Sequence, residues 1–402
     1  MLPVITVLIL AGCAVGPDYA RVEPDGPTEW HTQLQGGLTP GLPEPETLAH
    51  WWNVLNDEEL SSLEERAVEG NLDLKSARAR IREARALRGI SKADLFPTLD
   101  ASASATNYGS SENSSSTNEN KLYSAGFDAG WELDVFGGVR RSVEAAQADL
   151  EATQEDLYDV MVSLLAEVAL NYVEVRTFQT ALTVTESNIK SQEETYKLNR
   201  SRYQAGIINE LAVQQSLYNL ERTRSLIPAL ETGLEAAKNR LAVLLGENPG
   251  AVHGELAERK PIPIPPVTVA VGVPAETMRR RPDIRRAERN LAAQTERNLA
   301  AQTARIGVAT ADLYPKFRLM GTLGLESVST GNFLTADSRT WSTTPGVSWN
   351  IFHGGAIRQN IKVQSARQEQ ALIQYEYSIL KAQEEVENVL VAYAKQQRRR
   401  QS

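Results

Sequence analysis

The chain has 402 residues, enough for two or three ordinary domains, and a formal net charge of -9. Only 6% of its residues are aromatic, a composition that argues against a compact globule and suits long solvated helices. A negative net charge does not suggest a basic surface of the kind that binds nucleic acid, so we expect no nucleic-acid partner.

An apolar run begins the chain and ends at its single cysteine. The run Leu2–Leu10 is too short to span a hydrocarbon layer of about 30 Å and is typical of a signal-peptide core. It leads into Leu10-Ala11-Gly12-Cys13, which resembles the lipobox of bacterial lipoproteins. We therefore predict a signal peptide over residues 1–12 and acylation of Cys13, with a buried apolar cysteine as the plainer alternative. Ala14, in place of an aspartate, indicates the outer membrane.

The next two segments differ in pattern. Residues 13–50 are rich in Pro, Gly and Thr and are expected to form an extended strap on other structure. From Trp51 to Leu95 apolar residues recur with helical spacing, and Pro97 ends the pattern.

Alternation with period two then predicts strands at about 98–107 and 121–136. In the second strand the odd positions are apolar and the residues between them are small or polar, which separates an apolar face from a polar one. Its apolar positions are Tyr123, Ala125, Phe127, Ala129, Trp131, Leu133 and Val135. The stretch 107–120, rich in Ser and Asn, is expected to be an exposed loop.

A helical hairpin is predicted at about 139–246. Its first helix has neither Gly nor Pro as far as Ala205, which gives a length on the order of 100 Å. Gly206 is expected to end this helix and Asn209 to cap the return helix. Pro228 should kink or break that return helix.

The same pattern then occurs a second time. Ala93-Asp94-Leu95-Phe96-Pro97 matches Ala311-Asp312-Leu313-Tyr314-Pro315, and Gly137-Gly138 matches Gly354-Gly355. The residue numbers of Ala93 and Ala311 differ by a fixed amount, and we call this difference the repeat offset. The numbers of the equivalent glycines differ by one residue less.

We therefore divide the chain into a first repeat, 51–250, and a linker with a second repeat, 251–402. The second repeat has expected strands at about 316–328 and 340–352 and a helix at about 356–400. Residues 288–295 and 296–303 both read ERNLAAQT, a tandem copy that lengthens one helix.

The second repeat is shorter than the first at its end. By analogy with the first repeat, about sixty more residues should follow residue 402, and they should include a turn like that at Gly206 and a return helix. The pattern therefore predicts a truncated chain whose C-terminal helix is missing.

Four strands with one apolar face each have the length needed to cross an outer membrane. Four strands cannot close a barrel, and open edges are not tolerated in lipid. Three chains would supply twelve strands around an aqueous lumen. The expected fold is therefore mainly helical with membrane β-structure: a trimeric 12-strand β-barrel that continues as a periplasmic α-helical barrel.

A set of ordered motifs resembles the TolC-like outer-membrane efflux proteins, in the lipoprotein branch close to NodT and OprM. The resemblance covers nearly the whole chain and is carried by residues 13–19, 51–52, 93–97, 131–137, 202–206, 281–284 and 349–352. It implies a homotrimer in outer-membrane lipid that works as a passive duct with a periplasmic adaptor and an inner-membrane pump. It also implies that the hairpin tip docks the adaptor.

Candidate site residues follow from these patterns and from the resemblance. The tip residues are Arg202, Tyr203, Gly206 and Asn209, and the candidates for the lumen-facing side of a strand are Asp128, Glu132 and Asp134. The four histidines show no ligand spacing with the lone cysteine, so we expect no metal and no cofactor. No phosphate loop, nucleophile elbow or paired acid motif is present, and we expect no enzymatic activity.

Two alternatives remain at this point. The first is a lipid-anchored periplasmic coiled-coil scaffold without a pore, in which the alternating segments form a soluble sheet under a second layer of protein. The second is a truncated duct subunit that does not function. Aromatic residues near the strand ends, such as Tyr123 and Trp341, favour a membrane girdle over a soluble sheet.

Overall fold

The computed structural model describes residues 29–41, 44–109, 120–265, 268–272 and 310–401, together with Pro274, Thr277, residues 280–283 and Arg285. The predictions for the signal peptide, Cys13 and the ERNLAAQT copies lie outside the described residues. The chain divides into two compact units. The strand unit comprises residues 1–25, 80–155 and 280–382, and the helix unit comprises 26–79, 156–279 and 383–402. Each unit therefore combines segments from both sequence repeats.

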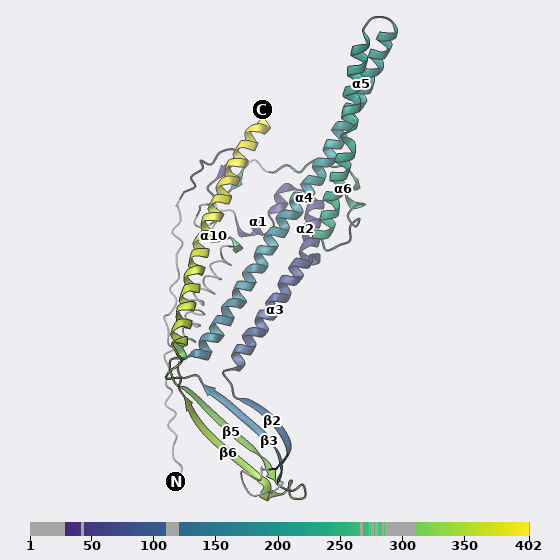
Figure 1. Ribbon diagram of the computed structural model, residues 1–402. Coiled ribbons are helices and arrows are strands. Elements are labelled where there is room, and N and C mark those ends of the chain that lie inside the picture. The colour runs from purple at the N-terminus through teal and green to yellow at the C-terminus, as the bar shows by residue number, and fades with distance from the viewer. Residues whose placement is uncertain are drawn as a thin grey trace. The chain divides into compact units, whose positions relative to one another are not determined.

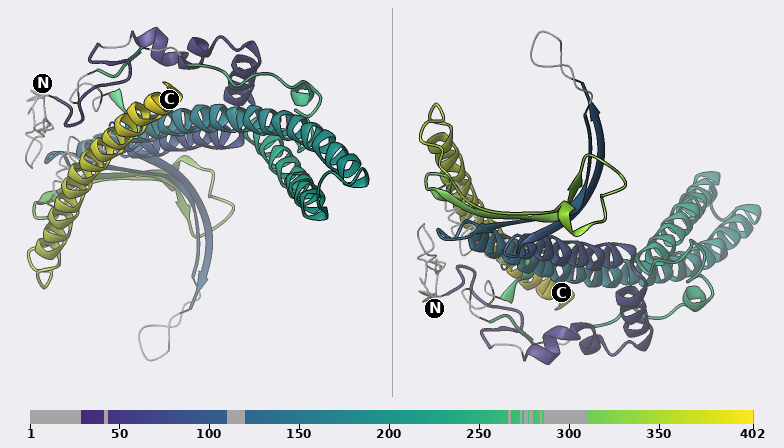
Figure 2. Two further views of the ribbon diagram at one scale, coloured as in Figure 1. Left: turned by 90° about the horizontal axis from the view of Figure 1, so that it is seen from above. Right: turned by 90° about the horizontal axis from the view of Figure 1, so that it is seen from below.

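The strand unit contains one antiparallel sheet of four strands in the order β2-β3-β5-β6 (Figure 1). The strands are β2 (Thr98–Tyr108), β3 (Asn120–Leu133), β5 (Lys316–Ser327) and β6 (Arg339–Ser348). The sheet is curved (Figure 2). Each repeat supplies one hairpin, and the two hairpins form one sheet because β3 of the first pairs with β5 of the second.

Two strands end earlier than expected. β3 ends at Leu133 because Asp134 caps the following helix: its carboxylate accepts hydrogen bonds from the backbone N–H groups of Val139 at 3.0 Å and Arg140 at 2.9 Å. The assignment of Asp134 to a strand face was therefore wrong. β6 ends at Ser348, before the expected end at about position 352.

Long helices follow both hairpins. α4 (Gly138–Gln204) has 67 residues and α10 (Ala356–Gln401) has 46. At 1.5 Å per residue, α4 is about 100 Å long. Glycines with positive φ precede both helices, Gly137 at 79° and Gly355 at 82°, and such angles are unfavourable for other residues.

From residue 51 on, the helix unit contains η1 (Trp51–Leu55), α2 (Glu58–Gly70) and the first turns of α3 (Leu72–Ala93). The continuous helical pattern expected from Trp51 is thus interrupted, because Asp57 and Asn71 each accept backbone hydrogen bonds as N-caps. The return segment is α5 (Glu210–Arg224) followed by α6 (Ile227–Leu244), so Pro228 marks a break, in the first turn of α6.

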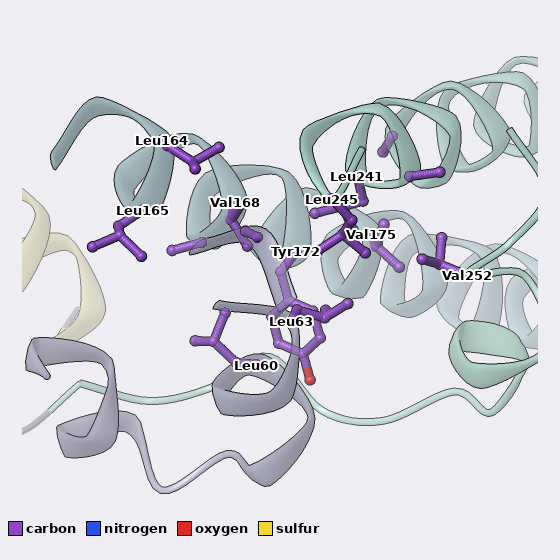
Figure 3. Packing of buried hydrophobic residues seen from close by; sticks show 14 of the residues in the cluster. Leu60, Leu63, Leu164, Leu165, Val168, Tyr172, Val175, Leu241, Leu245 and Val252 are labelled. Carbon is purple, nitrogen blue, oxygen red and sulfur yellow. The ribbon is translucent and has the colours of Figure 1, made fainter. Parts of the chain in front are cut away.

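The elements η1, α2, α3, α4 and α6 bury a common apolar cluster (Figure 3). Leu60, Leu63, Val168, Tyr172 and Leu241 are fully buried in it. Full burial of one such side chain is worth about 1.5–3 kcal/mol. The close contact of α2 with α6 requires glycine, because a Cβ on Gly70 would lie 2.0 Å from the carbonyl oxygen of Leu245.

A buried arginine side chain contacts this cluster. Arg176 is fully buried, pairs with Glu59, donates to the carbonyl oxygen of Glu258 at 2.9 Å, and lies 4.8 Å from the ring centroid of Tyr172. The Tyr172 hydroxyl donates to Asp57 at 2.7 Å. These contacts satisfy polar groups that would otherwise be costly to bury.

The described residues of the segment 29–50 contact other segments of the helix unit. β1 (Leu38–Thr39) pairs in parallel with β4 (Val269–Ala270). The Glu387 carboxylate accepts from the backbone N–H groups of His31 at 2.8 Å and Thr32 at 3.0 Å. The remaining short elements are α1 (Pro45–Ala49), η2 (Glu255–Ala257) and, in the strand unit, η3 (Ala336–Ser338).

Candidate functional site

The strand register places apolar residues of all four strands on one face of the sheet. In β3–β5, Phe127 faces Leu323 and Trp131 faces Leu319, and in β5–β6, Leu323 faces Trp341. The apolar face contains Leu99, Ala101, Ala103, Ala105, Tyr123, Ala125, Phe127, Ala129, Trp131, Leu133, Phe317, Leu319, Leu323, Leu325, Trp341, Pro345 and Val347.

This apolar face is exposed within the chain. Phe127 is 54% exposed, Leu323 63% and Trp341 73%. A soluble sheet would bury such residues under another layer, and exposed contiguous apolar surface of this kind indicates a lipid or protein contact. The strands have 10 to 14 residues, which meets the requirement of about 9–11 for crossing a bilayer.

The opposite face is polar and linked by side-chain hydrogen bonds. Asp128 accepts from the Ser102 hydroxyl at 3.0 Å, and Glu132 pairs with Arg318 at 3.2 Å. Both acidic residues predicted for the lumen-facing side thus lie on the polar face. Arg318 was not predicted, although its place in the alternating pattern of residues 316–327 puts it on the same side as Glu132.

Both hairpins carry equivalent contacts. The hydroxyls of Ser104 and Ser124 are 2.8 Å apart, and those of their equivalents by the repeat offset, Thr322 and Ser342, are also 2.8 Å apart. A tryptophan also fixes the start of each hairpin. The Trp131 indole donates to the carbonyl oxygen of Leu95 at 3.0 Å. The Trp349 indole donates to that of Leu313 at 2.9 Å.

The tip of the helical hairpin is a single exposed turn. Gly206 has φ 74°, and the backbone N–H of Ile207 donates to the carbonyl oxygen of Arg202 at 2.9 Å, which closes the end of α4. The Asn209 side chain accepts from the N–H of Ala212 at 3.2 Å and caps α5. Tyr203 is 44% exposed and Ile207 70%. The structure therefore brings all four predicted tip residues together.

The described residues contain no group of three or more His, Cys, Asp or Glu side chains that could hold a metal ion. None of the described helices is long and apolar enough to cross a membrane.

Antiparallel strands that alternate between an apolar and a polar face are typical of outer-membrane β-structure. The chain matches the outer membrane efflux protein family over residues 63–247 and 273–402. The chain belongs to this family of outer-membrane proteins.

Individual relatives agree with this assignment. Nodulation protein T of Rhizobium leguminosarum bv. trifolii is 31% identical over 392 residues, 97% of this chain and 81% of the relative. The probable outer membrane lipoprotein SilC of Salmonella typhimurium is 29% identical over 398 residues, 97% of this chain and 82% of the relative. The solved outer-membrane channel OprN has a TM-score of 0.86 and 35% identity, and covers 96% of this chain and 84% of that one.

Proposed function

We propose that the chain is one subunit of a trimeric efflux duct, a passive channel in the outer membrane. The observation that supports this most strongly is the four-stranded sheet, which has an uncovered apolar face, a polar face and, at each edge, a strand that is paired on one side only among the described residues. In a bilayer every backbone group must find a partner, so the sheet edges have to be closed. Three copies give twelve strands, an even number within the range of known barrels.

In this duct the polar face lines the lumen. Asp128 gives it an acidic lining, which favours cations during conduction, and Glu132 adds less to this because it pairs with Arg318. The helices α4, α5, α6 and α10 continue the duct into the periplasm. The alternative of a soluble scaffold needs a protein layer over the apolar face, and no described residue of the strand unit provides one.

The partners in this proposal are a periplasmic adaptor and an inner-membrane pump. The adaptor docks at the turn that contains Arg202, Tyr203, Gly206 and Asn209, where exposed Ile207 adds an apolar contact. Loss of adaptor co-purification in Ile207→Asp, with retention in the variant Glu231→Gln outside the turn, would support this docking site. Retention in both variants would contradict it.

The anchor in this proposal is an acylated Cys13. Its support is the Leu10-Ala11-Gly12-Cys13 motif and the similarity to a relative described as a lipoprotein. Mass spectrometry of the purified protein should find acyl chains at Cys13. An unmodified cysteine would contradict the anchor and leave the duct unaffected.

The test of the duct itself combines mass and conductance. The protein should be purified from outer membranes in mild detergent, weighed by light scattering, and reconstituted in planar bilayers. We expect a mass of three copies and a cation-selective conductance whose selectivity falls in Asp128→Asn with Glu132→Gln. A monomer without conductance would overturn the proposal.

A further inference from the structure

The apolar face of the sheet carries two cations at one of its ends. Lys121 lies at the start of β3 and Arg339 at the start of β6, both on the face that contains Phe127 and Trp341. We propose that these cations bind the phosphate groups of lipid A, the phosphorylated glycolipid of the outer leaflet of the outer membrane. The inference rests on the proposed position of the sheet in this membrane and adds a lipid-binding site to it.

The two cations are exceptions to the distribution of charge in the sheet. Every other charged residue of the four described strands lies on the polar face: Asp100, Asp128, Glu132, Lys316, Arg318 and Glu326. Lys121 and Arg339 are both exposed, and neither has a carboxylate partner among the described residues. An apolar face that excludes all other charges thus retains two unneutralised cations.

Both hairpins contain the same arrangement. Lys121 is related to Arg339 by the repeat offset, and each is followed two residues later on the same face by an aromatic residue, Tyr123 in one hairpin and Trp341 in the other. The cross-strand pairing obeys the same offset, since the partner of Lys121 is equivalent to the partner of Arg339. A cation beside an aromatic residue therefore occurs twice, at equivalent positions of the sheet.

The opposite end of the apolar face has aromatic residues without cations. Trp131 and Trp349 are equivalent by the repeat offset, and two positions beyond them the chain has Leu133 and Ile351. These strand ends lead into α4 and α10, which lie in the periplasm in the proposed duct. The cations therefore mark the end of the sheet that faces the cell exterior.

The spacing along the strand places the cations at the depth of lipid head groups. From Tyr123 to Trp131 the strand rises roughly 27 Å, or about 20 Å across the bilayer at a tilt of about 40°. On the same scale Lys121 lies about 5 Å beyond Tyr123, roughly 15 Å from the midpoint, where the hydrocarbon layer ends. Its side chain can lie along the apolar surface and hold the ammonium group at the phosphates.

The chemistry of lipid A matches both parts of this surface. Its acyl chains cover the apolar face, and its phosphates neutralise cations that would otherwise lie unpaired beside hydrocarbon. Arg339 can bind a phosphate through two parallel hydrogen bonds, whereas Lys121 supplies a point charge. A bilayer with the same phospholipids in both leaflets would not account for cations at one end only.

The test is a titration of the purified full chain in mild detergent with lipid A that carries both phosphates, followed by native mass spectrometry. Lys121→Gln with Arg339→Gln is expected to raise the apparent Kd at least about tenfold, because two charge-assisted contacts are lost. Lys121→Arg with Arg339→Lys keeps both charges and should stay within about threefold of the parent chain. Lipid A without its phosphates should bind the parent chain and the glutamine variant equally weakly.

A matched control removes the same charges elsewhere in the strand unit. Arg358 and Lys362 are exposed residues near the start of α10. Arg358→Gln with Lys362→Gln lowers the net charge by the same amount and should bind lipid A as the parent chain does. An equal loss of binding in this control would show that net charge alone sets the affinity, and it would overturn the site.

The outcomes separate the lipid site from the duct. An unchanged Kd in Lys121→Gln with Arg339→Gln, at a mass of three copies and with the conductance of the parent chain, overturns the lipid site and leaves the duct intact. Phosphatidylglycerol that binds as tightly as lipid A, with an equal loss in the variant, overturns the assignment to lipid A. A parent chain that is a monomer without conductance overturns the duct and the lipid site together.

Single substitutions cover the case in which the double variant does not assemble. Lys121→Gln and Arg339→Gln should each raise the Kd for lipid A by about threefold, because each removes one of two equivalent contacts. Two single variants that assemble and bind as the parent chain does would also overturn the site.

Discussion

In the helix unit, Leu60, Leu63 and Leu241 are fully buried among α2, α4 and α6, whereas in the strand unit Leu99, Leu323 and Trp341 are 70%, 63% and 73% exposed. The same residue types thus meet two environments in one chain. The helix unit buries its apolar side chains against one another, as the core of a water-soluble protein does. The strand unit leaves them uncovered on one face, and this requires an apolar surrounding outside the chain. Three substitutions test this difference.

The largest expected effect is in the buried cluster. Leu63→Ala removes a fully buried side chain, and because the neighbouring helices can only partly close the cavity, we expect a loss of about 2–5 kcal/mol in the free energy of unfolding. Urea unfolding followed by circular dichroism at 222 nm measures it. Leu72→Ala, at a position 66% exposed, is the control and should change little. Equal losses in the two variants would contradict the assignment of the cluster.

The second effect concerns the exposed apolar face. Phe127→Arg places a charge where we expect lipid and should cost about 2–4 kcal/mol per copy near the bilayer midplane. Thr322→Arg lies on the polar face opposite Asp128 and is the matched control. The measurement is unfolding in phospholipid vesicles, together with the fraction of protein recovered in outer membranes. If both arginines are tolerated equally, the apolar face does not contact lipid.

The smallest effect, compared per pH unit, concerns a polar group buried beside this cluster. Glu64 is fully buried, neither of its carboxylate oxygens has a hydrogen-bond partner among the described residues, and burial raises its pKa from 4.5 to about 8. The folded protein thus retains a proton that the unfolded chain loses above pH 4.5. Stability should therefore fall as the pH rises from about 4.5 to 8, by up to about 1.4 kcal/mol per pH unit.

Glu64→Gln should remove this pH dependence, because glutamine has no ionisable proton. The neighbouring Glu65, which is exposed, provides the control variant Glu65→Gln, and it should keep the slope of the parent protein. Unfolding free energies at pH 5, 6, 7 and 8 are sufficient. A slope that survives in Glu64→Gln would show that another group titrates.

The sequence predicted the elements better than their contacts. The alternation at residues 123–135 is local, so it revealed a two-faced strand directly. The β3–β5 register joins strands from different repeats, far apart in the chain, and no local pattern encodes it. Asp134 was misplaced because its alternation continues that of the strand, whereas its carboxylate caps α4. The turn at Gly206 and the cap at Asn209 were predictable because both depend on local backbone geometry.

Two features that were not predicted are nevertheless visible in the spacing of residues along the sequence. The helical positions i, i+3, i+4 and i+7 from Leu60 include Glu64, so the spacing already places this carboxyl on the buried side of α2. The indole contacts of Trp131 with Leu95 and Trp349 with Leu313 each span 36 residues. This equal spacing in two repeats was visible before the structure, but only the geometry assigns it a role.

The repeat offset is constant through both hairpins, and this has a consequence for how such chains change in length. The offset falls by one position between Trp349 and Gly354, immediately after the last strand. Within the strands a single inserted residue would exchange the two faces of everything beyond it. In the proposed membrane span, a change in length by one residue is therefore compatible with the two faces of the sheet only outside the strands, as between Trp349 and Gly354.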